Sequence, residues 1–255
     1  GGPPCQPFSI AGKHRGPDDP RDMWPQAIRA VRELEPRAFL FENVRGLART
    51  AFADYLRYIV ERLRRPAMVA RRGEDWRTHL SRLAHLRVHD GEGPLYRVEV
   101  RKINAADYGA AQKRHRVIIV GVRLDLGIDW KFPAPTHSRE SLIQDQFIEG
   151  DYWRRHRFPI DLRPQPNSND RRVAERIAER LDRPIEEPWT TVRDVISDLP
   201  DPRIPQAARV MNHRYQPGAR SYKGHTGSSL DEPAKALKAG DHGVPGGENM
   251  LAHSD

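Results

Sequence analysis

The sequence predicts an α/β fold over about residues 1–130, and two observations carry this prediction. Short apolar runs at residues 38–41 and 117–121 have the length and composition of buried strands. Residues 24–34 and 52–63 repeat apolar side chains at the spacing of amphipathic helices. Helices that alternate with strands in this way favour a sheet that is covered by helices.

Each predicted helix has one apolar face. In the first helix this face is formed by Trp24, Ala27, Ile28, Val31 and Leu34. In the second helix it is formed by Phe52, Tyr55, Leu56, Ile59, Val60 and Leu63. Pro36 follows the first helix, and because proline has a fixed φ and no N–H we expect the helix to end before it.

Polar side chains follow the strand predicted at residues 38–41. Glu42 and Asn43 stand at the carboxyl end of this strand, which is where ligands bind in doubly wound sheets. Residues 95–103 alternate between apolar and polar side chains and predict a further strand. The uninterrupted apolar run at residues 117–121 is typical of a central strand.

Three regions lie outside this pattern. Residues 66–94 are rich in arginine, and we expect a surface insertion there. One helix is predicted within it from the spacing of Trp76, Leu80, Leu83 and Ala84. Residues 137–225 are polar and rich in proline and arginine, which predicts a second, irregular module, and residues 230–251 are rich in glycine and proline with no strong helix or strand pattern. Within the module, helical spacing is seen only at Val173, Ala174, Ile177 and Leu181.

Charge is concentrated in the first part of the chain. The 255 residues carry a net charge of +8, and 36 of the 43 basic residues are arginine. Residues 1–136 hold 25 basic and 16 acidic residues, whereas residues 226–255 hold 2 and 5. A basic excess beside the candidate site residues suits a polyanionic partner, and arginine suits phosphate and guanine recognition. A GC-rich genome that favours arginine codons explains the high share of arginine equally well.

Several classes of protein are disfavoured. Cys5 is the single cysteine, so no disulfide can form within the chain, which fits a reducing cytoplasm. No run approaches the roughly 18 apolar residues of a membrane span, and no signal peptide precedes Cys5. The 11 histidines show no metal-binding pattern, so we expect isolated surface histidines and no metal. We therefore expect a cytoplasmic protein, associated with the nucleoid if its partner is DNA.

The first nine residues read Gly-Gly-Pro-Pro-Cys-Gln-Pro-Phe-Ser. A lone cysteine in this setting suits a nucleophile, since a thiolate attacks and Pro4 and Pro7 restrict the backbone around it. Gln6 and Ser9 can hydrogen-bond to a substrate or to the backbone. The alternative is that Cys5 is a small buried apolar residue.

Two further motifs follow Cys5 along the chain. Residues 41–44 read Phe-Glu-Asn-Val, with Glu42 placed 37 residues after Cys5 and beyond a helix. Glu42 could also act only as a cap of the following turn. Residues 104–116 read Asn-Ala-Ala-Asp-Tyr-Gly-Ala-Ala-Gln-Lys-Arg-His-Arg and lead into the apolar strand. Because Arg114 and Arg116 lead into this strand, we expect them to share one face, with His115 on the opposite face.

Together these motifs resemble those of the DNA (cytosine-5)-methyltransferases, whose signatures are Pro-Cys-Gln, Glu-Asn-Val and Gln-x-Arg-x-Arg. The resemblance implies a Rossmann-like, S-adenosylmethionine-dependent methyltransferase sheet, present in part, in a catalytic domain over residues 1–136. It further implies a target-recognition region at residues 137–225 and, at residues 226–255, a linker towards closing motifs. The implied activity is methylation of cytosine C5 in double-stranded DNA, in a restriction-modification system if a cognate endonuclease exists.

The resemblance also implies roles for individual residues. The Cys5 thiolate would attack C6 of a flipped-out cytosine, and Glu42 would hydrogen-bond to N3. One guanidinium, of Arg114 or Arg116, would bind O2 while the other anchors a phosphate or orders the catalytic loop. The substrate-binding residues would be Gln6, Ser9, Asn43 and Gln112. Pro4 would line one side of the cofactor site.

The chain departs from the family pattern in two places. The Gly-rich turn that holds S-adenosylmethionine would precede Cys5, and the closing motifs would follow Asn249; neither is found. We therefore expect the isolated chain to bind the cofactor weakly and to lack activity. Two alternatives remain open. One is a methyltransferase of the same family that acts on transfer RNA, and the other is a non-catalytic or split-enzyme DNA-binding fragment.

Overall fold

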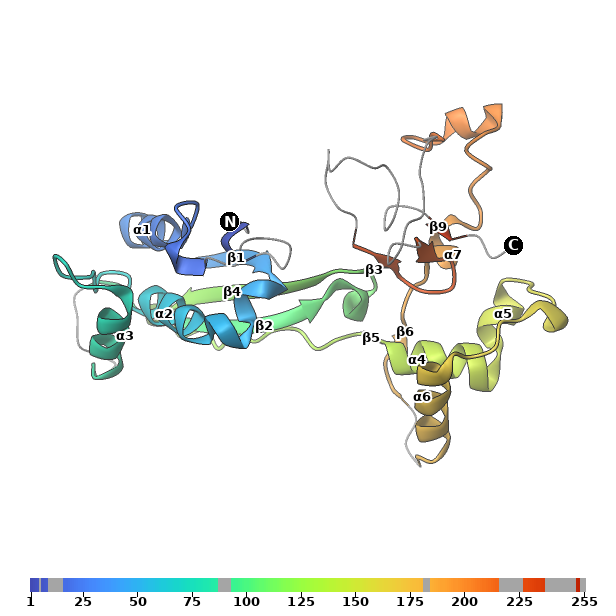
Figure 1. Ribbon diagram of the computed structural model, residues 1–255, viewed down its shortest axis with the longest axis horizontal. Helices are drawn as coiled ribbons and strands as arrows, with labels where there is room; N and C mark the ends of the chain where they lie inside the picture. Colours follow the sequence, from blue (N-terminus) through green and yellow to red (C-terminus); the bar gives the residue numbers. More distant parts are fainter. Residues whose placement is uncertain are drawn as a thin grey trace. The chain divides into compact units, whose positions relative to one another are not determined.

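The structure is a computed structural model that describes residues 1–4, 6–8, 16–86, 93–180, 184–215, 227–236 and 251–252. The chain divides into two compact units (Figure 1). Unit 1 comprises Gly1–Ile103 and His115–Pro133, and unit 2 comprises Asn104–Arg114 and Ala134–Asp255. No helix among the described residues is long and apolar enough to cross a membrane.

The fold is mixed α/β. Unit 1 contains helices α1 (Trp24–Leu34), α2 (Ala53–Arg64) and α3 (Trp76–Ala84) and strands β1 (Ala38–Val44), β2 (Tyr96–Asn104) and β4 (His115–Arg123). Unit 2 contains helices α4 (Arg139–Ile143), α5 (Asp151–Arg155), α6 (Ser168–Ala178) and α7 (Val192–Ile196). Its strands have two residues each: β3 (Gln112–Lys113), β5 (His137–Ser138), β6 (Glu187–Pro188), β7 (Ser228–Ser229), β8 (Ala234–Lys235) and β9 (Leu251–Ala252).

The sheet of unit 1 has three described strands in the order β1-β4-β2. β1 and β4 are antiparallel, with Phe41 opposite Ile119. Main-chain hydrogen bonds join β2 and β4 at both ends, from Leu124 N to Leu95 O (2.8 Å) and from Ala105 N to Arg114 O (3.1 Å), so this pair is also antiparallel. β4 is thus the central strand, as its apolar run predicted.

A doubly wound, Rossmann-like sheet is not clearly seen among the described strands, which form a small antiparallel sheet. The physical reason is the short connection between β2 and β4, residues 105–114, which contains no crossover helix. A connection of this length lets the chain turn back on itself, which gives an antiparallel pair. The structure confirms the predicted α/β class, because helices and strands together form one mixed α/β unit.

The core of unit 1 lies between the sheet and the three helices. Trp24, Ile28 and Val31 bury the predicted face of α1 except at its end, where Leu34 is 77% exposed. Tyr55, Ile59 and Leu63 are the buried residues of the predicted face of α2. Phe8, from the N-terminal motif, is fully buried and packs its ring edge-on against Phe52, with centroids 5.4 Å apart. Burying such a ring typically contributes about 1.5–3 kcal/mol, so it anchors the segment that follows Cys5.

The arginine-rich insertion is not only a surface feature, contrary to the expectation. Its helix α3 begins at the N-cap Asp75, which accepts hydrogen bonds from the amides of Arg77 and Thr78. α3 buries His79, Leu80 and Leu83 against the core. The apolar spacing that predicted a helix therefore also predicted a buried face.

Unit 2 is irregular, as its composition indicated, and has two small described cores. One joins Leu142, Tyr152 and Trp153, and the other joins Ile143 to Val173 and Ile177 of α6. Leu181 and most of the Gly- and Pro-rich segment at residues 231–249 lie outside the described residues. Residues 227–236 form β7 and β8, and β8 pairs with β3 in parallel.

Candidate functional site

The first residues of the chain lie along the free edge of β1. The main-chain N of Gly1 donates to Leu40 O (2.6 Å), and Glu42 N donates to Gly1 O (3.0 Å). These two bonds have the pattern of a parallel pair in which Gly1 lies beside Phe41. The first motif and the Glu-Asn-Val motif, about 40 residues apart in the sequence, are therefore side by side in unit 1.

Asn43 fastens the two motifs together. It is only 2% exposed, and its Nδ2 donates to the carbonyl oxygen of Pro3 (3.1 Å) while its Oδ1 accepts from Val44 N (2.9 Å). A buried amide with both ends bonded holds its partners in one arrangement. Cys5 lies outside the described residues, but it follows Pro3 by two positions, so Asn43 fixes the backbone directly before it.

Gly46 fixes the backbone after Cys5. A Cβ on Gly46 would stand 1.9 Å from the carbonyl oxygen of Phe8, which is far below any allowed contact. Only glycine lets the two backbones approach this closely. Together with the burial of the Phe8 ring, this contact sets the position of residues 6–8, a short 3₁₀ turn.

Glu42 and Arg116 form an ion pair on one face of the sheet. Arg116 donates from Nε to Oε1 of Glu42, and from Nη1 to its neighbour's carbonyl, His115 O (2.8 Å). The register explains the pair: Arg116 lies opposite Val44, and Glu42 precedes Val44 by two residues and so points to the same face. The side chains are 41% exposed for Glu42 and 20% for Arg116, so the carboxylate can still be reached from solvent.

The other predicted site residues lie elsewhere or on the surface. Pro4 and Gln6 flank Cys5 and are exposed, and Ser9 lies outside the described residues. Gln112 and Arg114 belong to unit 2, where Gln112 is half-buried in β3 and Arg114 is exposed just before β4. The structure thus assembles Glu42, Asn43 and Arg116 with the N-terminal segment, whereas Gln112 and Arg114 are held by unit 2. Whether these residues act in catalysis stays a prediction.

Two groups of residues with evident structural roles were missed by the sequence analysis. Gly46 stands three residues after Asn43, and a glycine so close to a candidate site could have suggested a close backbone approach. Asp107 and Trp189 are hydrogen-bonded to each other in unit 2, and no local pattern links them because 82 positions separate them. Carboxyl oxygens of Asp145, Glu149 and Asp151 also lie within 4.8 Å of one another, but Asp145 is paired with Arg155 and the cluster alone does not indicate a bound ion.

The family is decided by comparison with known proteins. The family model described as "C-5 cytosine-specific DNA methylase" matches residues 1–65 and 77–231, which is most of the chain. This chain belongs to that family. Residues 66–76, between the two matched stretches, hold part of the insertion and the first residue of α3.

Curated relatives agree with this assignment. The chain is 32% identical to the type II methyltransferase M.AquIA of Picosynechococcus over 226 residues, which cover 84% of this chain and 69% of that protein. It is 38% identical to M.HgiCII of Herpetosiphon aurantiacus over 144 residues (56% of this chain, 26% of that protein). It is 34% identical to M.NgoMIV of Neisseria gonorrhoeae over 149 residues (58% and 39%). The matched stretch therefore spans 69% of the first relative and well under half of the other two.

Members of this family use S-adenosylmethionine as methyl donor. A nucleotide-type site on such a sheet needs main-chain N–H donors at a glycine turn and a carboxylate for the ribose. Among the described residues at the β1 edge, the predicted contact is Pro4, which is exposed and has no N–H to donate. The described residues do not by themselves compose the cofactor site.

Proposed function

We propose that this chain carries out the covalent chemistry of DNA cytosine-5 methylation, with Cys5 as the nucleophile. The observation that carries the proposal is the junction of the N-terminal motif with β1, where Asn43 bonds to Pro3 and Gly46 receives Phe8. Both sides of Cys5 are fixed against the strand that bears Glu42. A cysteine between two such anchored segments suits a nucleophile that attacks a base turned out of the duplex.

The proposed reaction uses the chain's own residues at both ends of the sequence of steps. The Cys5 thiolate adds to C6 of cytosine, and a hydrogen bond from the protonated Glu42 carboxyl group to N3 draws electron density out of the ring. C5 then becomes a nucleophilic enamine carbon, and S-adenosylmethionine, when bound, would supply the methyl group and leave as S-adenosylhomocysteine. Loss of the C5 proton to a base and elimination of the thiolate from C6 restore the aromatic ring and the free cysteine.

The ion pair on β1 and β4 refines the role of Arg116. Its Nε bonds to Glu42, and this supports a role of Arg116 in orienting the carboxyl group. The remaining role, contact with cytosine O2 or with a phosphate, then falls to Arg114, which is exposed. Arginine suits either contact because its planar fork makes two parallel hydrogen bonds.

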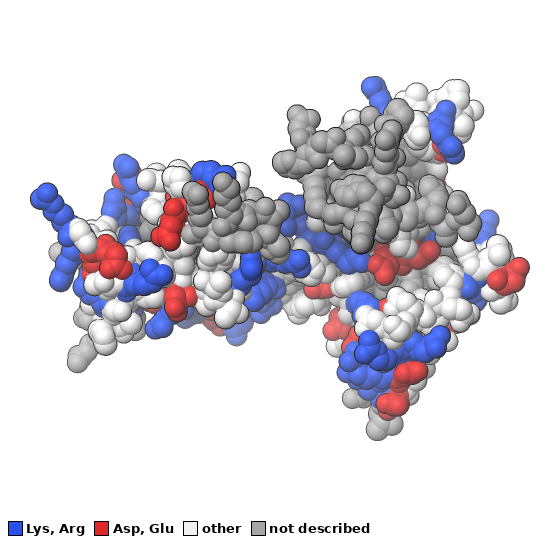
Figure 2. Space-filling view, in the orientation of Figure 1, with Lys and Arg blue, Asp and Glu red and all other residues white. Residues whose placement is uncertain are grey.

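We further propose that the three described strands are part of a larger Rossmann-like sheet. The support is the parallel pairing of Gly1 with Phe41, which continues the sheet beyond the free edge of β1. We also propose that residues 137–225 select the target sequence. Basic side chains lie over α6 in Figure 2, together with acidic ones, and Arg171 and Arg172 are exposed there. Exposed arginines on a helix are suited to phosphate contacts, which position a protein on DNA.

The test is covalent trapping on DNA that contains 5-fluorocytosine at target sites, with S-adenosylmethionine and the complete protein. Fluorine at C5 cannot leave as a proton does, so the thiolate stays bonded to C6 and the complex survives denaturation. We expect trapping by the wild type and none by Cys5→Ala. Equal trapping by both would refute the assignment of Cys5. Trapping on transfer RNA in place of DNA would favour the RNA-modifying alternative.

A further inference from the structure

We propose that Trp189 is a positioning residue that sets the loop carrying Gln112 and Arg114, through its hydrogen bond to Asp107. This inference rests on the proposed function, because it assumes that the loop at residues 104–114 contributes side chains to the reaction. The indole Nε1 of Trp189 donates to Oδ1 of Asp107 at 3.0 Å. Hydrogen bonds to a carboxylate are stronger than those between neutral groups, and they fix direction as well as distance.

The loop belongs to unit 2, although the segments directly before and after it in the sequence belong to unit 1. It connects β2 to β4, yet its contacts assign residues Asn104–Arg114 to unit 2. Within the loop, Ala110 N donates to Ala105 O (3.2 Å), and Gly109 adopts a positive φ of 87°. The residues that carry Gln112 and Arg114 are therefore shaped by the unit that we propose to read the DNA.

Three separate segments of unit 2 contact the loop. Thr136 N donates to Asp107 O (2.9 Å), and the imidazole of His137 lies 2.9 Å from where a Cβ of Gly109 would stand. Ala234 N donates to Ala111 O (2.8 Å), next to the pairing of β3 with β8. The third contact is the hydrogen bond from Trp189. It is a side-chain contact, so it can be removed by substitution without breaking the main-chain bonds.

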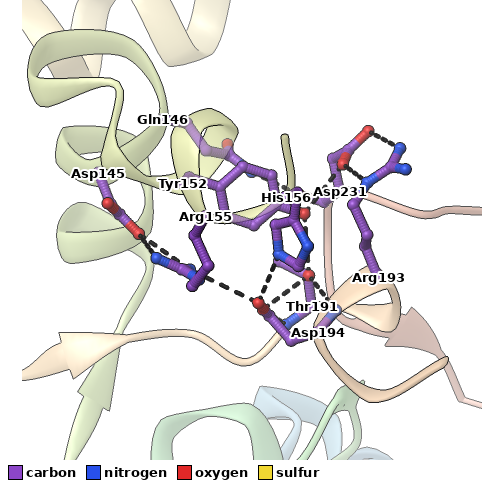
Figure 3. A network of polar contacts seen from close by, with 9 residues as sticks. All are labelled: Asp145, Gln146, Tyr152, Arg155, His156, Thr191, Arg193, Asp194 and Asp231. Carbon is purple, nitrogen blue, oxygen red and sulfur yellow. Dashed lines mark hydrogen bonds and ion pairs between the residues drawn. The ribbon is translucent and has the colours of Figure 1, made fainter. Parts of the chain in front are cut away.

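Trp189 itself is held by a rigid segment. Its main-chain N donates to Ser138 O (3.2 Å), and two residues later Thr191 caps helix α7 in a capping box with Asp194. Figure 3 shows the polar network around this cap, in which His156 and Thr191 both bond to the carboxylate of Asp194. A rigid donor makes the indole suitable for setting the loop, because it does not move to follow its acceptor.

The same network connects the segment that contains Trp189 and Thr191 to Asp231, near the C-terminal part of unit 2. Tyr152 bonds through its hydroxyl to Thr191 Oγ1 (3.0 Å) and to Asp231 Oδ1 (2.9 Å), and Arg193 pairs with Asp231 (Figure 3). Asp231 lies one residue before Glu232, which pairs with Lys113 in the loop. The loop is thus held on both sides by one connected set of polar contacts.

The experiment compares Trp189→Phe with the matched variant Trp153→Phe in the complete protein. Phenylalanine keeps an aromatic ring and removes the indole N–H. Trp153 also donates an indole hydrogen bond in unit 2, to Gln146 O (2.7 Å) and not to the loop, and it belongs to the apolar cluster against which Trp189 packs. We expect Trp189→Phe to lower kcat for methylation of target DNA about 10-fold or more, with KM for DNA changed less than 2-fold. Trp153→Phe should keep wild-type kcat, although it loses at least as much thermal stability.

A double-mutant cycle and a conservative rescue complete the test. Asp107→Ala should lower kcat at least as much as Trp189→Phe, because it also removes the hydrogen bond from Asn104 Nδ2 (3.5 Å). The double variant should be no slower than Asp107→Ala, in which the Trp189 bond is already lost. Asp107→Asn, which keeps an acceptor oxygen, should restore at least half of the lost activity. Additive losses, or an equal loss in Trp153→Phe, would overturn the inference. A wild type that methylates no cytosine refutes the proposed function instead, so the two failures are distinguished.

Discussion

The carbonyl oxygen of Phe8 lies 1.9 Å from the place where a Cβ would stand on Gly46. This contact joins the segment that follows Cys5 to the segment that follows Glu42, with Phe8 fully buried beneath it. The close approach excludes every side chain at residue 46. The geometry of the candidate site therefore depends on a residue that has no side chain to take part in it.

Gly46→Ala should displace Phe8 and with it the backbone beside Cys5. We expect a loss of about 1–3 kcal/mol in the free energy of unfolding, the usual cost of overpacking a close contact. The rate of trapping on 5-fluorocytosine DNA should fall in parallel. Gly2→Ala is the control for stability, because a Cβ there would stand 3.8 Å from its nearest neighbour, Glu42 O. Similar unfolding curves for Gly46→Ala and Gly2→Ala would show that the contact can relax.

Glu42→Gln tests the chemical role of the carboxyl group. The amide keeps the shape and one acceptor oxygen but has no acidic proton. We therefore expect methyl transfer to fall by roughly 10²–10⁴-fold, as for loss of a general acid. The unfolding free energy should change by less than about 1 kcal/mol, because the ion pair with Arg116 is partly exposed. Glu99→Gln, at an exposed position of β2, is the matched control and should retain full activity. Full activity of Glu42→Gln would return Glu42 to a structural role.

His79 predicts a pH dependence of stability, and its burial corrects the expectation that the histidines lie on the surface. It is fully buried on α3, and its Nδ1 shares a hydrogen bond with the hydroxyl of Tyr58 (3.1 Å). Burial, followed by the charges of Arg62 and Arg82, lowers the pKa of His79 from 6.5 to about 4. Between pH 6.5 and pH 4 the unfolded chain binds a proton that the folded chain does not.

Stability should therefore fall as the pH falls through this window, by on the order of 3 kcal/mol at its lower end. Urea unfolding at a series of pH values measures the effect. His79→Gln removes the titrating group and should flatten the dependence between pH 6.5 and pH 4. His85→Gln, at the exposed end of the same helix, should leave the wild-type slope in place. An unchanged slope in His79→Gln would assign the pH dependence to other groups.

A graft tests where the target sequence is read. Replacing residues 137–225 with the corresponding region of a relative of different specificity should move the methylated site, as seen by bisulfite sequencing. The graft should be most active when the tryptophan at residue 189 is kept, because Asp107 lies outside the exchanged region and needs its donor. Methylation at the original site by an active chimera would place recognition elsewhere in the chain.

The amino-acid sequence by itself determined the local elements and the family. The apolar spacings of α1 and α2 and the apolar run in β4 are set by residues close together in the chain, and the structure confirms these elements. The three motifs were sufficient to identify the family, which the match to residues 1–65 and 77–231 confirms. Such features are predictable because periodicity and motif order need no knowledge of long-range contacts.

Only the tertiary structure decided which distant segments meet. The pairing of Gly1 with β1, the approach of Phe8 to Gly46 and the contact of His79 with Tyr58 join residues that are 21 to 41 positions apart. The antiparallel order β1-β4-β2 and the capture of the loop at residues 104–114 by unit 2 are of the same kind. These features depend on packing between segments that are far apart in the sequence. A local sequence pattern does not contain this information, because the neighbours that surround a residue in space come from elsewhere in the chain.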